Sequence, residues 1–350
     1  MARLKRVDCS EAGIRRRRRG KGFEYLDADG RRITEEAVLE RIRELAIPPA
    51  WEDVWICPYP MGHIQATGLD AAGRKQYRYH DRWRERRDRE KFEEMRDFAR
   101  ALPKLRARVQ SDLALEGMPR ERALACAVRL LDRGFFRIGS EDYAEENDTY
   151  GVATMLQDHV TVEGDRVEFD YESKGGQRRE LGLSDPAVAE VVRLLKSRRG
   201  GGDELLAYKD GRRWADVKSA DINAYVKEIT GGDFSAKDFR TWGGTVAAAV
   251  ELAAAGPAAA STTKTARKRA KTWAIKRVAR RLDNTPAVAR ASYIDPRVFD
   301  RYDGGRTIGG VFIEFAKDTG AWPELQPAVE EAVLDLLEGD WSSDAVEKVA

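Results

Sequence analysis

The sequence is poor in the side chains that bind metals or form cross-links. It contains three cysteines and three histidines in 350 residues. Cys9, Cys57 and Cys126 lie far apart and form no CxxC pair, so they predict neither a disulfide framework nor a zinc site. The histidines also lack the short spacing of metal ligands. We therefore expect a protein of a reducing compartment that contains no metal.

Long apolar runs and nucleotide-binding loops are missing as well. No stretch of about 18 apolar residues is present, so no membrane span is expected. The arginine run at 15–19 is not followed by the apolar segment of a signal peptide. There is no GxxxxGK[ST] pattern of the kind that binds ATP. These absences favour a soluble, cytoplasmic protein without a nucleotide cofactor.

Charged residues, by contrast, are abundant and unevenly distributed. Residues 1–21 carry nine basic and two acidic side chains, whereas residues 321–350 carry eight acidic and one basic. Such separation favours a polyanionic partner, and two ordinary disordered ends are the alternative. We expect a basic, disordered N-terminus over 1–21. We also expect an acidic C-terminal tail over 326–350 that faces solvent or reduces the positive electrostatic field of the basic segments.

The chain between these ends predicts two domains of different secondary structure. Residues 22–85 contain alternating strand patterns and one short amphipathic helix, which predict a small β-rich domain. Residues 86–325 are mainly helical in pattern, with a small antiparallel sheet expected at 159–183. The expected fold is therefore of the α+β class, and a highly charged helix beginning near residue 81 joins its two domains.

One predicted strand of the first domain combines cations with aromatic rings. Lys75, Tyr77 and Tyr79 alternate to one face of this strand, and Gln76 belongs to the other face. Beside Arg74, the first face can contact phosphates and can stack or hydrogen-bond at bases. An ordinary edge strand with exposed aromatic residues is the alternative interpretation.

In the second domain, a tyrosine follows a strongly basic segment. From Lys264 to Arg281 there are nine Lys or Arg and no acidic residue. Thr285 can cap a helix whose first turn holds Pro286, and Tyr293 falls near the end of that helix. This order suggests a hydroxyl brought to a phosphodiester, whereas a core tyrosine beside a solvated helix is the alternative.

Three further cations stand at unusual positions. Arg137 is flanked by apolar residues on both sides, so we expect it to be part-buried and to need an anion. Lys174 precedes the Gly175-Gly176 turn and is expected at a hairpin tip, where simple exposure is the alternative to a function. Arg240 lies in the first turns of a helix, where the helix dipole disfavours a cation, so another interaction should hold it there.

Taken in order, Arg137, Lys174, Arg240, Asn284 and Tyr293 resemble the active-site series of type IB DNA topoisomerases, in the compact poxvirus-like branch found in bacteria. Poxviral and eukaryotic members carry histidine nine residues before the tyrosine, where this chain has asparagine. Further motifs of that branch span most of the chain. They are Ile47 to Trp51, Gly62 to Gly68, Gly73 to His80, Phe136 to Gly139, Phe239 to Gly243 and Ser292 to Ile294.

This resemblance implies a two-domain clamp on duplex DNA, with a mainly helical catalytic domain. Tyr293 is expected to cleave one strand through a 3′-phosphotyrosyl link, allow rotation and religate, without ATP or an obligatory metal. Arg137 and Arg240 are expected to bind the non-bridging oxygens, Lys174 to protonate the leaving 5′-oxygen, and Asn284 to complete the oxygen cradle.

The expected partner is duplex DNA in the nucleoid, with no membrane and no obligatory protein partner, so we expect a monomer. A tyrosine site-specific recombinase, which uses a similar catalytic constellation, and a non-catalytic DNA-packing protein are the alternatives. The residues expected to contact DNA are Arg74, Lys75, Gln76, Tyr77, Tyr79 and Tyr143.

Overall fold

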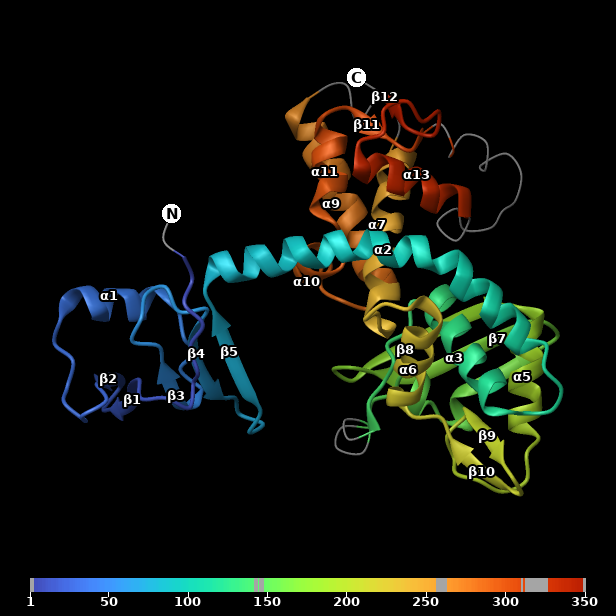
Figure 1. Cartoon of the computed structure of the whole chain (residues 1–350), viewed down its shortest axis with the longest axis horizontal. Helices are drawn as coiled ribbons and strands as arrows, with labels where there is room; N and C mark the ends of the chain where they lie inside the picture. The colour runs from blue at the N-terminus through green and yellow to red at the C-terminus, as the bar shows by residue number, and fades with distance from the viewer. Residues whose placement is uncertain are drawn as a thin grey trace. The chain divides into compact units, whose positions relative to one another are not determined.

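The chain divides into two compact units, Met1–Lys91 and Phe92–Ala350 (Figure 1). The computed structural model describes residues 3–141, 144, 148–255, 263–309, 311 and 327–348. Helix α2 (Asp81–Leu113) runs through the division, which lies a few residues beyond the boundary that we expected after residue 85. Within the described ranges, no helix is long and apolar enough to cross a membrane.

The first unit is built on a five-stranded antiparallel sheet with the spatial order β2-β1-β3-β4-β5. Helix α1 (Glu36–Glu44) contributes Ile42 to a core that also contains Val54 and Ile56. Because β5 lies at an edge of the sheet, one side of its backbone pairs with no other strand of that sheet. The strands are β1 (Ile14–Arg19), β2 (Gly22–Leu26), β3 (Glu52–Ile56), β4 (Ile64–Leu69) and β5 (Lys75–Tyr79).

The arginine run forms strand β1, so the prediction of disorder over 1–21 was wrong for this part. Its charges are compensated by side chains of the neighbouring strand β2. The guanidinium of Arg16 lies 4.2 Å from the centroid of the Phe23 ring, and Arg17 Nε donates to Glu24 Oε1 at 2.6 Å. A run of like charges is therefore compatible with a strand when the partner strand supplies aromatic and acidic groups.

The second unit packs helices around one hydrophobic core and adds small antiparallel sheets, which confirms the expected α+β class. Helix α7 is at the centre of this core, and most of its residues are buried. The helices that follow α2 are α3 (Arg120–Gly134), α5 (Pro186–Lys196), α6 (Ser219–Thr230), α7 (Ala236–Ala254), α9 (Lys264–Arg281), α10 (Pro286–Ser292), α11 (Pro296–Asp303) and α13 (Pro327–Glu338). The strands are β6 (Val160–Glu163), β7 (Arg166–Ser173), β8 (Gln177–Ser184), β9 (Ala207–Asp210), β10 (Arg213–Asp216), β11 (Arg306–Thr307) and β12 (Glu347–Lys348).

Strands β7 and β8 form the hairpin expected around Gly175-Gly176. Both glycines have positive φ angles, 89° and 69°, which a residue with a side chain rarely adopts. The register pairs Tyr171 with Arg179, so both of these side chains belong to the buried face of the sheet. Lys174 is the first residue after β7 and is exposed at the hairpin tip, as predicted.

The acidic C-terminal segment is not a solvated tail. Helix α13 buries Val333 and Leu337 in the core of the second unit. Glu330, on the same helix, accepts a hydrogen bond of 2.9 Å from Trp242 Nε1 and forms an ion pair with Arg106. The expectation for 326–350 was wrong because the segment is amphipathic, and two of its carboxylates, Glu330 and Glu338, pair with arginines of the same unit.

Candidate active site

Tyr293 lies at the junction between α10 and α11, as its flanking residues predict. Thr285 caps α10 through its side-chain oxygen, and the Tyr293 amide donates to the Ala289 carbonyl at 3.0 Å, closing the last turn. Asp295 then caps α11 by accepting from the Arg297 amide at 2.9 Å. Two caps within ten residues leave only a short link between the helices, so the position of the tyrosine is closely constrained.

Helix α7 holds this junction from the other side. The Thr245 hydroxyl accepts from the Asp295 amide at 3.1 Å and lies 3.4 Å from the Tyr293 carbonyl oxygen. At Gly244, an added Cβ would lie 2.7 Å from the same carbonyl oxygen, so only glycine permits this close approach. The backbone of Tyr293 is therefore fixed against the helix that also carries Arg240.

Arg240 is almost fully buried, with 3% of its surface exposed. Its guanidinium donates to the carbonyl oxygens of Phe135 and Leu282, and its Cζ lies 5.2 Å from the centroid of the Tyr293 ring. Burial lowers the pKa of Arg240 to about 10, the nearby charge of Arg137 acts in the same direction, and Tyr293 opposes both. Keeping a buried guanidinium charged costs free energy, and an anion placed beside it lowers that cost.

Arg137 is half-buried, as expected, and meets the Asn284 segment. One of its terminal nitrogens donates to the Asp283 carbonyl at 2.6 Å and to Asn284 Oδ1 at 3.2 Å. Its other terminal nitrogen, Nη1, has no hydrogen-bond partner within the described residues and lies 3.7 Å from the Asp283 carboxylate. Asn284 Nδ2 donates to the Leu282 carbonyl, which Arg240 also binds. The asparagine thus connects the two arginines.

Arg179 on β8 is a member of this cluster that the sequence analysis missed. It is buried, and one terminal nitrogen donates to the carbonyls of Gly134, Phe135 and Arg281 at 3.0, 3.2 and 3.3 Å. Those carbonyls belong to the segments that carry Arg137 and Asn284. Period-two alternation outward from the hairpin turn places residue 179 on the inward face, and that signal could have identified it.

Lys174 and Arg137 line one hollow of about 230 Å³ in the second unit. The hairpin tip supplies the lysine, and the segment after α3 supplies the arginine together with Ile138 and Gly139. Tyr150 and Thr149 form another wall. Arg137 therefore belongs both to the cluster around Tyr293 and to the hollow that contains Lys174, and it is the link between them.

In the first unit, β5 presents the aromatic face that its alternation predicts. The rings of Tyr77 and Tyr79 are stacked, with centroids 5.9 Å apart and planes inclined by 15°. Lys75 Nζ lies 5.6 Å from the Tyr77 ring centroid, and 42% of Tyr77 is exposed. A cation beside two stacked rings, one exposed and one half-buried, is a surface suited to nucleic acid.

Arg74 and Gln76 are held in a different way. Arg74 Nε and Gln76 Nε2 both donate to Asp70 Oδ2, at 3.0 and 2.8 Å. These hydrogen bonds, led by the one from the Arg74 amide, lower the pKa of Asp70. The structure thus separates these two residues from Lys75, Tyr77 and Tyr79. Tyr143, also expected at the DNA, lies outside the described residues.

Comparison with known proteins gives the family of the chain. Residues 80–303 match the family described as the catalytic core of eukaryotic DNA topoisomerase I, and residues 22–70 match the N-terminal domain of bacterial DNA topoisomerase IB. DNA topoisomerase 1B of Acanthamoeba polyphaga mimivirus is 30% identical over 317 residues, covering 87% of this chain and 91% of that protein. The chain belongs to the type IB DNA topoisomerases.

More distant relatives match less than half of this type IB topoisomerase. DNA topoisomerase 1 of Daucus carota is 27% identical over 160 residues, which cover 45% of this chain and 19% of that protein. The family makes the protein a DNA-acting enzyme and decides against a non-catalytic DNA-packing protein and a site-specific recombinase. The match to bacterial DNA topoisomerase IB falls in the β-rich first unit, over residues 22–70.

Proposed function

We propose that Tyr293 is the nucleophile with which this topoisomerase cleaves one strand of duplex DNA. The observation that supports this most is the position of the buried Arg240 guanidinium, 5.2 Å from the Tyr293 ring centroid and bonded to two backbone carbonyls. A free tyrosine has a pKa near 10, so its hydroxyl needs a cationic site to lose a proton at neutral pH.

The arginines stabilise the phosphate during the attack. The Tyr293 oxygen bonds to phosphorus, and negative charge grows on the two non-bridging oxygens as the bond to the 5′-oxygen breaks. Arg137 lies close enough to Arg240 for its charge to lower the pKa of Arg240, and Arg137 Nη1 has no hydrogen-bond partner in the described part of the chain. Donors fixed in place before the substrate binds stabilise such charge without reorganisation. Asn284 keeps Arg137 oriented through its Oδ1.

Lys174 is the general acid for the departing strand. Its ammonium group transfers a proton to the 5′-oxygen, which leaves as a hydroxyl while the 3′ end remains esterified to Tyr293. The exposed hairpin tip places this lysine on the hollow that Arg137 shares. After the broken strand rotates, the 5′-hydroxyl attacks the phosphotyrosine and restores the strand. Because the ester conserves the energy of the cleaved bond, the cycle uses no ATP, and the arginines and lysine take the place of a metal.

The β5 face of the first unit contacts the duplex. Tyr77 and Tyr79 lie against bases or sugars in the major groove, while Lys75 and Arg74 mainly contact phosphates. Gln76 reaches a base only if it exchanges its hydrogen bond to Asp70 for one to DNA. The enzyme acts as a monomer in the nucleoid and needs no partner protein.

Relaxation of a negatively supercoiled plasmid tests this cycle. The purified chain, in excess chelator and without ATP, is expected to give a ladder of relaxed topoisomers. Detergent should trap a covalent complex in which the protein is attached to the 3′ side of the break and the 5′ end is a free hydroxyl. Relaxation that requires ATP or a divalent cation, or attachment at the 5′ side, would contradict the proposal.

A further inference from the structure

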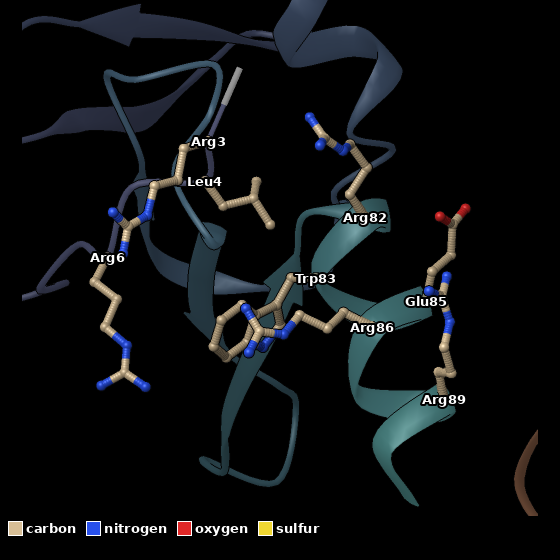
Figure 2. A pocket seen from close by; sticks show the side chains of 8 residues that line it. All are labelled: Arg3, Leu4, Arg6, Arg82, Trp83, Glu85, Arg86 and Arg89. Atoms are coloured by element: carbon tan, nitrogen blue, oxygen red, sulfur yellow. The ribbon is translucent and has the colours of Figure 1, made fainter. Parts of the chain in front are cut away.

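A second strongly basic feature of the first unit lies apart from the aromatic face of β5. It is a hollow of about 1030 Å³ between the N-terminal segment and the first turns of α2 (Figure 2). Five arginines and one glutamate are among its lining residues. The full lining is Arg3, Leu4, Arg6, Arg82, Trp83, Glu85, Arg86 and Arg89.

The two walls of this basic hollow are held in position by the fold. The N-terminal wall is fixed by backbone pairing, because the Lys5 amide donates to the Met61 carbonyl at 2.8 Å and the His63 amide donates to the Lys5 carbonyl at 2.9 Å. The Val7 amide also donates to His63 Nδ1 at 3.2 Å. The other wall is one face of α2, since residues 82, 85, 86 and 89 are three or four apart.

Trp83 joins the two walls. Its ring packs edge-on against the His63 ring at a centroid distance of 4.8 Å, and the Arg6 guanidinium lies 6.0 Å from the tryptophan ring centroid. The indole therefore supports one of the arginines through a cation–π contact. Figure 2 shows Arg6 on the N-terminal segment and Trp83 and Arg86 on α2, with all three side chains lining the hollow.

The positive charge of the hollow is only partly compensated within the chain. Arg86 forms an ion pair of 2.7 Å with Glu90, and Glu85 adds one carboxylate. Across the described residues, none forms an ion pair with Arg3, Arg6 or Arg89. Like charges gathered around a hollow repel one another, and an anion in the hollow removes that repulsion.

We propose that this hollow binds the phosphodiester backbone of duplex DNA, as a second contact of the first unit. Its volume exceeds what a single phosphate ion fills, and the arginines come from two segments, which suits a run of phosphates. Its α2 wall begins three residues after Tyr79, the last residue of β5, and the positive end of the α2 dipole lies there. We therefore expect the hollow to bind the DNA backbone that borders the groove entered by β5. The inference rests on the proposed duplex contact of β5.

The salt dependence of DNA binding tests the proposal. We compare the full chain with the triple variant Arg3→Gln/Arg6→Gln/Arg89→Gln by fluorescence anisotropy on a short duplex over a range of salt concentrations. Each phosphate contact contributes about 0.9 to the slope of log affinity against log salt, so the slope should fall by roughly two to three. Unchanged circular dichroism and melting temperature establish that the variant is folded.

A matched control removes the same charge from elsewhere in the same unit. Arg17, Arg31 and Arg43 are exposed, and each forms its own ion pair, with Glu24, Asp29 and Glu36. Arg17→Gln/Arg31→Gln/Arg43→Gln should lower the slope by less than about one. An equal fall in both triple variants would show a net-charge effect and overturn the site, as would no fall in the Arg3, Arg6 and Arg89 variant.

Two further readouts separate this inference from the cleavage chemistry. Ethylation of certain individual phosphates should weaken DNA binding by the full chain. Ethylation of the same phosphates should not affect DNA binding by the Arg3, Arg6 and Arg89 variant. If the variant lost affinity for single-stranded DNA alone, the assignment to duplex would be overturned.

At low salt the variant should still form the covalent complex, because Tyr293 and its cluster are intact. Failure of the unaltered chain to form that complex would contradict the proposed function instead.

Discussion

The two units of the molecule use the same kind of side chain under opposite conditions. On β5 of the first unit, Lys75 and Tyr77 are exposed, with 42% of Tyr77 accessible, and Tyr79 is half-buried. In the second unit, Arg240 and Arg179 are buried and bonded to backbone carbonyls that fix their directions. Exposed cations are screened by salt and can move to meet a ligand, whereas buried cations keep one geometry.

We propose that this difference separates binding from chemistry, with one exception: Lys174 is an exposed cation of the second unit that we propose as the general acid. Loss of an exposed cation on β5 should change affinity and its salt dependence and leave the cleavage step intact. Loss of a buried cation around Tyr293 should slow the cleavage step itself, even in a complex already bound to DNA. The predictions below follow that comparison from the largest expected effect to the smallest.

Lys174→Ala should give the largest loss of rate among the cluster variants that keep Tyr293. If Lys174 is the general acid, single-turnover cleavage of bound DNA should slow by about 10²–10⁴-fold. A substrate with sulfur at the bridging 5′ position has a leaving group that needs no proton. This substrate should restore cleavage by Lys174→Ala.

Arg240→Ala is the matched comparison for that rescue. It removes a donor to the non-bridging oxygens, so sulfur at the 5′ position should leave its defect in place. Equal rescue of the two variants, or rescue of neither, would show that the proton donor has been assigned wrongly.

Arg179→Met should slow cleavage by about 10–100-fold, because three carbonyls around the site lose a charged donor. Arg178 is the matched control, since it precedes Arg179 on the same strand but is 67% exposed and pairs with Asp170. Arg178→Met should change the rate by less than about twofold. Rates are measured with saturating enzyme on a single-site duplex, and equal effects of the two substitutions would remove the distinction between buried and exposed arginines.

Tyr77→Ala combined with Tyr79→Ala should change which sites are cut, while the rate at a site once bound stays within a few-fold. The stacked rings of Tyr77 and Tyr79 lie on one face of β5 in the first unit, and neither belongs to the cluster around Tyr293. Cleavage patterns on a long labelled duplex report the choice of site. A pattern identical to that of the unaltered chain would argue against base-proximal contact.

Lys75→Gln should have the smallest effect. One exposed lysine contributes one phosphate contact, so the salt slope of binding should fall by about one unit with no change in the choice of site. Equilibrium binding at several salt concentrations measures this slope. A change in cleavage pattern comparable to that of the tyrosine variant would mean that Lys75 contacts bases.

Local signals in the sequence were sufficient for several parts of the site. Thr285, Pro286 and the Asp295-Pro296 pair define helix ends, so they place Tyr293 at a junction without any tertiary information. The two glycines after Lys174 define a turn in the same way. Alternation along β5 correctly assigned Lys75, Tyr77 and Tyr79 to one face.

Other parts depended on contacts between distant segments. The carbonyls that Arg179 binds are 44, 45 and 102 residues away in the chain, so no spacing rule identifies them. The strand over 14–19 was hidden because its arginines are compensated by β2 and not by their own neighbours in sequence. Helix α13 carried a visible apolar stripe, but its many acidic residues outweighed that stripe in the prediction of a tail.

The nucleophile is the centre of the account, and Tyr293→Phe tests it most directly. The substitution removes one oxygen from a half-buried ring whose backbone is held by Thr245, so folding and DNA binding should be retained. The variant and the unaltered chain are incubated with end-labelled duplex, quenched with detergent and separated by mass. The account predicts a covalent complex for the unaltered chain and none for Tyr293→Phe; a detergent-stable complex formed by the variant would contradict it.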